Sequence, residues 1–151
     1  MEIIKNRVIV DDATKHLADD APVPATGDVT VSLSRYGAER EALAARADRV
    51  GVRIKPDEDV DEIVPHLGQI KLIAVEFPKF TDGRGYSTAR LLRERHGYRG
   101  ELRAIGHVLR DQLFYMQRVG FDAFEMAPGK SVQDALNAFS DFSVTYQTTG
   151  A

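Results

Sequence analysis

The sequence predicts a single α/β domain with a mainly parallel, open sheet of about five βα units. The 151 residues are 43% hydrophobic and 28% charged, a composition typical of one globular domain. Short β-rich runs are each followed by a polar turn and then by apolar residues at helical spacing. This alternation favours consecutive βα units, arranged as in flavodoxin or as part of a βα-barrel. The runs begin near Val29, Val50, Leu72, Leu102 and Ala123.

The segment before the first of these runs is predicted to be an N-terminal strand and arm, residues 1–27, ahead of an α/β domain formed by residues 28–151. Arg7–Val10 is its one predicted strand, and the proline-containing stretch Asp19–Ala25 is a polar connector. Such an arm can pack on its own domain or on a second copy of the chain. The sequence leaves both arrangements open, including a homodimer.

Three apolar stripes predict helices between the strands. Val60–Leu67 is one of them, and Pro65 is expected to kink or shorten it. Leu109–Met116 is another, with Gly120 as its C-terminal cap. The clearest stripe runs from Val132 to Phe142. We expect the apolar side chains of these stripes to pack in the core.

Two of the predicted strands differ in their patterns. Leu72–Val75 is a continuous apolar run, as expected for a strand covered on both faces, so Leu72–Phe77 is predicted to be central. Val50–Ile54 alternates between apolar and other residues, which suits a more exposed position. In open parallel sheets, ligands collect beyond the carboxyl ends of the strands. The loop after Phe77 is therefore the first place to expect a binding site.

The composition excludes several classes of function. The chain has no cysteine, which rules out disulfides, thiolate nucleophiles, cysteine-ligated iron–sulfur clusters and cysteine zinc sites. No apolar run reaches the roughly 18 to 20 residues that cross a bilayer. We therefore expect a soluble, cytoplasmic protein without a membrane partner. The net charge of −3 and the lack of a recognised reading module argue against binding to nucleic acid.

Positive charge nevertheless gathers between Lys79 and Arg118, where nine basic residues stand against four acidic ones, a net +5. The loop before Arg90 has two glycines for tight turns and leads into a helix N-terminus with free N–H groups. Arginine side chains there would hold an oxyanion, carboxylate or phosphate. The alternative is structural, with Asp82 as a helix cap and Arg84 in a local ion pair. The anion-binding candidates are Lys79, Gly83, Arg84, Gly85, Tyr86, Ser87, Arg90, Arg110 and Gln112.

Candidate catalytic residues are few. His107 and Asp111 follow the next predicted strand and would share a helix face as a base and its orienting carboxylate, and Asp82 is a third acid–base candidate. The other histidines are scattered, so no metal site is predicted. The glycine loop lacks the third glycine of the dinucleotide fingerprint, and no cofactor is evident. The stretch ending at Ser131 lacks the first glycine of a phosphate-binding P-loop, so this serine is predicted to cap a helix.

Two longer segments carry a family resemblance. They read FPKFTDGRGYSTARLLRER, from Phe77 to Arg95, and GYRGELRAIGHVLRDQLFYMQRVGFDAF, from Gly97 to Phe124, and a looser likeness runs from Ile9 to Gln147. These segments resemble the signature of a bacterial family of unknown function whose members are commonly labelled as oxidoreductases involved in sulfite reduction. The resemblance implies an accessory role in assimilatory sulfate or sulfite reduction, with a sulfite reductase component as a partner. It implies no catalytic residues.

Three functions are compatible with the sequence. The first is an accessory protein that binds an oxyanion or a sulfite reductase component through the basic rim of residues 79–112. The second is a small enzyme acting on a phosphorylated or carboxylated metabolite, with arginines holding the anion. The third is a non-catalytic docking or dimerisation module. The family label implies an oxidoreductase, but no redox cofactor motif accompanies it, so the sequence leaves enzymatic activity open.

Overall fold

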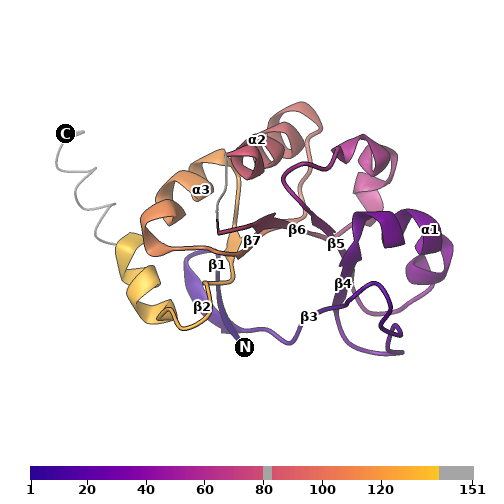
Figure 1. The fold of residues 1–151 in the computed structure, drawn as a ribbon, viewed down its shortest axis with the longest axis horizontal. Coiled ribbons are helices and arrows are strands. Elements are labelled where there is room, and N and C mark those ends of the chain that lie inside the picture. Colours follow the sequence, from indigo (N-terminus) through magenta and orange to yellow (C-terminus); the bar gives the residue numbers. More distant parts are fainter. Residues whose placement is uncertain (80–82, 140–151) are drawn as a thin grey trace.

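The computed structural model describes residues 1–79 and 83–139, and its strands form one curled, mostly parallel sheet with helices along one side (Figure 1). Strands β3 to β8 are parallel and follow one another in chain order, whereas β1 is antiparallel to both of its neighbours. The molecule is thus a single-domain α/β half-barrel. In sheet order the strands are β2 (Val8–Asp11), β1 (Glu2–Lys5), β8 (Ala123–Phe124), β7 (Glu101–Gly106), β6 (Leu72–Phe77), β5 (Val50–Ile54), β4 (Val29–Ser32) and β3 (Lys15–His16).

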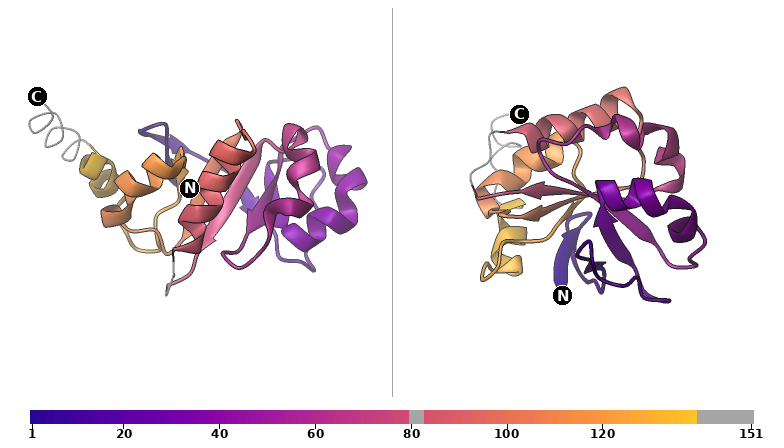
Figure 2. Two further views of the ribbon diagram at one scale, coloured as in Figure 1. Left: turned by 90° about the horizontal axis from the view of Figure 1, so that it is seen from above. Right: turned by 45° about the vertical axis from the view of Figure 1, so that its right-hand side comes forward.

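This strand order distinguishes the two predicted arrangements. Consecutive order places the crossover connections on the same face of the sheet, because such connections are right-handed. Helices α1 (Leu33–Ala44), α2 (Arg84–Arg90) and α3 (Leu113–Val119) accordingly lie along one side of it (Figure 1). A flavodoxin-like sheet reverses its strand order and carries helices on both faces. The flavodoxin-like alternative is therefore not confirmed, and the curl of the sheet agrees with the partial-barrel alternative (Figure 2).

The five predicted strand starts are confirmed to within one residue, but five complete βα units are not. The connection after β5 consists of two 3-10 segments, Val60–Glu62 and Val64–Gln69, instead of an α-helix. Pro65 lies at the start of the second segment. Because proline has no N–H group to donate to a preceding carbonyl, an α-helix from Val60 cannot continue through it.

Two other predicted helix boundaries are confirmed. Helix α3 ends at Gly120, whose φ of 122° lies in the region that favours glycine. Residues 132–139 are helical, and the Ser131 hydroxyl accepts a hydrogen bond from the Asp134 N–H at 3.0 Å, as an N-cap does. Phe142, the last residue of that predicted stripe, lies outside the described residues.

The N-terminal segment differs from its prediction because it forms a hairpin and a third short strand. Asn6 and Arg7 have φ values of 52° and 63° and make the two-residue turn between β1 and β2. The predicted strand Arg7–Val10 is therefore wrong at its first residue. Strand β1 pairs with β8, so the hairpin belongs to the same sheet.

The two outer strands of the sheet order, β2 and β3, are joined by residues 12–14 alone. Four extended residue steps span at most about 14 Å. The sheet must therefore curl until its two ends approach each other, and its inner face encloses a narrow interior.

The two faces of the sheet have different chemistry. Alternate strand residues such as Val31, Val52 and Ile73 are fully buried in the apolar core under the helices. The prediction of a central strand is confirmed for β6, which lies between β5 and β7 and exposes none of residues 72–75. Strand β5 is more exposed than β6, since Val50 and Arg53 are half-buried, but it lies inside the sheet between β4 and β6, and its polar Arg53 belongs to the inner face.

Within the described residues, the helices are too short or too polar to cross a bilayer.

Candidate functional site

The carboxyl ends of β6 and β7 bring the two predicted loops together at one edge of the sheet. Phe77 and Gly106 are register partners, and the Phe77 carbonyl accepts a hydrogen bond from the His107 N–H at 2.6 Å. Gly106 has a φ of 94°, and a Cβ atom there would lie 2.6 Å from the Phe77 oxygen. Only glycine allows this close approach of the two loops.

The start of α2 is shaped by its two glycines. Gly83 precedes the helix with a φ of 90°, and Gly85 packs so closely on the Phe77 ring that a Cβ atom would lie 2.7 Å from it. This packing carries Tyr86 between two other rings, 5.3 Å from Phe77 and 5.1 Å from Tyr115 of α3. Burial raises the pKa of Tyr86, and the neighbouring Tyr115 raises it further. The tyrosine therefore stays neutral at neutral pH.

Beside these rings lies an open hollow of about 460 Å³, here called the α2 hollow. It follows the outer side of α2 and of the π-helical turn Leu91–Arg95 that continues it. Tyr115 closes one side and is 49% exposed. The predicted residues Gly83, Tyr86, Ser87 and Arg90 line the hollow, together with Leu91, Glu94, Arg95 and Tyr115.

Arg110 lies elsewhere on the same edge. It forms an exposed ion pair with Asp134 at 2.8 Å and lines a smaller hollow of about 210 Å³ with Asp111, Lys130 and other residues. Gln112 caps its own 3-10 turn, since its Oε1 accepts the Leu109 N–H at 3.2 Å. Four of the nine predicted anion-binding residues thus line the α2 hollow, and Arg110 lines the smaller one.

The remaining candidates are placed as follows. Lys79 is exposed after β6, Arg84 is exposed as the first residue of α2, and His107 is half-buried after β7. Asp82 lies outside the described residues. Among residues 1–79 and 83–139, no three His, Asp or Glu side chains gather as they would to hold a metal ion.

A buried ion network on the inner face of the sheet escaped the sequence analysis. Arg103 of β7 has no exposed surface, and its guanidinium lies 2.7 Å from Glu101, 2.8 Å from Glu125 and 3.1 Å from Asp12. Three carboxylates around one cation satisfy a guanidinium whose burial alone would be very costly. The signal was present in the sequence, because Glu101 and Arg103 alternate with apolar residues within one strand.

The same network ties the N-terminal segment to the sheet. Glu101 also contacts Lys5 of β1 at 2.9 Å and Arg49 at 3.0 Å. His16 of β3 lies 2.8 Å from Glu125 and 2.7 Å from the Thr30 hydroxyl. Because charges of opposite sign are matched within the protein, we interpret the network as the polar filling of the half-barrel and not as a ligand site.

The network predicts a loss of stability in acid. Burial raises the pKa of Asp12, but hydrogen bonds from Arg103 and Thr14 lower it to about 2, against 3.8 in an ordinary aspartate. Burial alone would raise the pKa values of Glu101 and Glu125. Their basic partners outweigh this effect, so the pKa values of both glutamates lie below the ordinary value.

Because these folded-state pKa values lie below the unfolded ones, the unfolded chain binds protons first as the pH falls. The contribution is complete above about pH 5.5 and is lost progressively as the pH falls toward 2, and Asp12 contributes less than about 2 kcal/mol because it is only partly buried. Urea unfolding followed by circular dichroism between pH 6 and pH 2 measures this. An unfolding free energy that stays constant over that range would contradict the prediction.

Comparison with known proteins places the chain in a family. A search of curated proteins found no match. The family model described as "Bacterial protein of unknown function (DUF934)" matches residues 51–151, which include every residue of the α2 hollow. Since this match covers about two thirds of the sequence, the chain belongs to the DUF934 family of bacterial proteins.

Proposed function

We propose that this protein is an accessory protein of assimilatory sulfate or sulfite reduction and that its α2 hollow docks on an acidic segment of a sulfite reductase component. The single observation that carries the docking proposal is the lining of the hollow: Arg90, Arg95 and the exposed Tyr115 surround one open depression. The enzyme and homodimer readings remain alternatives without a comparable observation.

The chemistry of the lining favours a protein segment over a small molecule. Two arginines stand against one acid, Glu94, so the depression attracts negative charge. Arginine forks bind carboxylates with two hydrogen bonds, and arginine and tyrosine are enriched among the residues that dominate binding at protein interfaces. The depression is open to solvent along a whole helix, whereas small-molecule sites usually enclose most of their ligand.

The connection to sulfite reduction rests on the family resemblance. The segments 77–95 and 97–124 carry the likeness to proteins labelled with that process, and all eight residues of the hollow come from these two segments. If this protein shares the role of the proteins that it resembles, the surface of the α2 hollow is where we expect that role to be carried out.

A binding measurement with purified sulfite reductase tests the proposal. The double variant Arg90→Met/Arg95→Met should bind at least about tenfold more weakly than the wild type, because each arginine supplies charge-assisted hydrogen bonds. The matched control is Arg99→Met/Arg118→Met, which removes two exposed arginines of the same basic segment outside the hollow and should bind as the wild type does.

If both double variants bound equally weakly, the loss of affinity would come from the change in net charge alone, and docking through the hollow would be refuted. No binding to sulfite reductase by the wild type would also refute it. Titration with sulfate and sulfite forms a second arm: if these ions alone bind and the hollow variant loses that binding, the oxyanion alternative replaces the docking proposal.

A further inference from the structure

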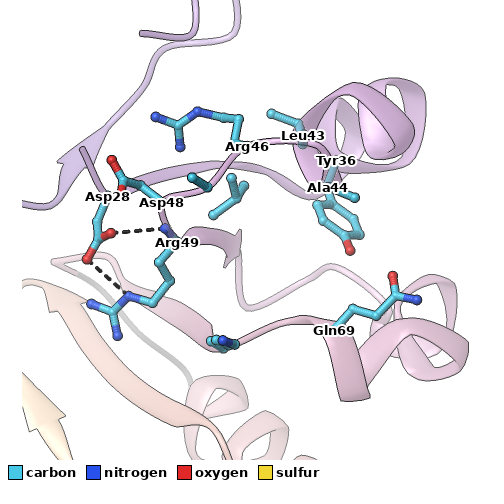
Figure 3. Close-up of a pocket in the computed structure, with 11 residues that line it drawn as sticks. Asp28, Tyr36, Leu43, Ala44, Arg46, Asp48, Arg49 and Gln69 are labelled. Carbon is cyan, nitrogen blue, oxygen red and sulfur yellow. Dashed lines mark hydrogen bonds and ion pairs between the residues drawn. The ribbon is translucent and has the colours of Figure 1, made fainter. Parts of the chain in front are cut away.

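A further hollow, of about 530 Å³, lies before the amino ends of β4, β5 and β6 (Figure 3). Asp28, Arg49 and Lys71 each stand one residue ahead of one of these strands and line it. Its volume is within the range of small-molecule sites. The basic rim considered above begins at the opposite, carboxyl ends of the strands, so the two sites are independent.

The acidic groups of this hollow are already engaged by the protein. Asp28 accepts a hydrogen bond from the Arg49 N–H at 3.0 Å and lies 3.4 Å from the Arg49 side chain (Figure 3). Asp48 accepts a hydrogen bond from the Gly27 N–H at 2.5 Å. These contacts satisfy the two carboxylates, and three basic residues of the lining outnumber them, so the hollow does not select cations.

Basic and hydroxyl donors remain for a ligand. Arg46 donates to the carbonyls of Pro24 and Gly27, while its Nη1 is buried and has no hydrogen-bond partner among the described residues. Lys71 is exposed at the other side of the lining. The Tyr36 hydroxyl is directed toward Gln69 across the hollow (Figure 3).

The remaining wall is apolar. Tyr36 is 6% exposed, so its ring forms a fixed surface, and Leu43 and Val50 add aliphatic side chains beside it. A ligand that fits both parts needs a planar or apolar body and one anionic group. A carboxylate meets the second condition, because the ammonium of Lys71 supplies N–H donors that the carboxylate oxygens accept.

We propose that this hollow is a binding site for a small organic carboxylate whose apolar body rests against Tyr36, Leu43 and Val50 and whose carboxylate is held by Lys71. This site takes a metabolite and does not depend on the docking surface of α2.

Sodium benzoate is the probe for the test, with neutral benzyl alcohol as its uncharged counterpart. Titration into the full chain, followed by amide chemical shifts, should give saturable shifts at residues 44, 47, 50 and 71, with a dissociation constant on the order of 1 mM for so small a ligand. Benzyl alcohol should bind at least about tenfold more weakly, since it lacks the charge.

Two variants locate the contacts. Lys71→Met should weaken benzoate binding about tenfold or more, whereas the control Lys55→Met, an exposed lysine at the carboxyl end of β5, should leave it unchanged. Tyr36→Phe removes the hydroxyl alone and should weaken binding about fivefold. Absence of saturable shifts, equal binding of the alcohol, or the same affinity in Lys71→Met and wild type would each overturn the proposal.

Discussion

Replacing Arg103 with methionine is expected to destabilise the protein by about 3 to 5 kcal/mol. The substitution keeps an unbranched apolar stem but removes the guanidinium that Asp12, Glu101 and Glu125 surround. Three carboxylates would then face one another in a buried place, where they repel and have lost the donors of the guanidinium. Urea unfolding at pH 7, followed by circular dichroism, gives the free energy directly, and the melting temperature should fall by roughly 10 °C.

Arg118→Met is the matched control for this variant. Arg118 is exposed on α3, and its replacement should change the unfolding free energy by no more than about 0.5 kcal/mol. The deficit of Arg103→Met should also shrink as the pH falls toward 3, because protonation relieves the repulsion between the carboxylates. A loss below about 1 kcal/mol at pH 7 would mean that the network contributes little to stability.

Gly106→Ala is the second large effect, with an expected loss of about 3 kcal/mol. The residue has a φ of 94°, a backbone conformation that costs an alanine about 1 to 2 kcal/mol. Its new Cβ atom would also meet the Phe77 oxygen at 2.6 Å, and a backbone atom cannot move aside cheaply. The loops after β6 and β7 would separate, and the hydrogen bond from His107 to Phe77 would weaken.

Gly129→Ala separates the two causes of this loss. Gly129 has a similar φ of 81°, but no atom lies within 4 Å of a Cβ atom placed there. It should therefore lose only the conformational part, about 1 kcal/mol. Thermal and urea unfolding of both variants measure the difference, and equal losses would show that the contact with Phe77 does not matter.

The apolar patterns of this sequence predict most of the parallel strands because each strand buries one face under helices. Leu72–Val75 is apolar throughout, and β6 is central as expected. Val50–Ile54 is more exposed than β6, as its alternation indicates, but its polar residue does not face the solvent. An alternating polar residue normally faces water, but Arg53 faces the curled interior, where its guanidinium donates to the carbonyls of Thr30 and Leu17. The alternation of polar and apolar residues alone does not show whether the polar side chains face water or a polar interior.

The candidate site was predicted in part. Ser87 lies in the first turn of α2 and Arg90 at its end, soon after the loop that the strand pattern indicates, and both line the α2 hollow. Tyr115 and Arg95 were missed because they enter from a second helix and from the far end of the first. Arg110 was predicted to share the hollow, but it pairs with Asp134, 24 residues along the chain, and lines the smaller hollow. Such pairings depend on tertiary packing.

The pairing of β1 with β8 has a consequence for how the chain folds during synthesis. Ile4 and Phe124 are register partners 120 residues apart, so the hairpin made by residues 2–11 has no partner strand until nearly the whole domain has left the ribosome. Contacts of such long sequence separation form late and slowly. Until then the apolar side chains of that hairpin are exposed, and we expect chaperones to protect the nascent chain from aggregation over this interval.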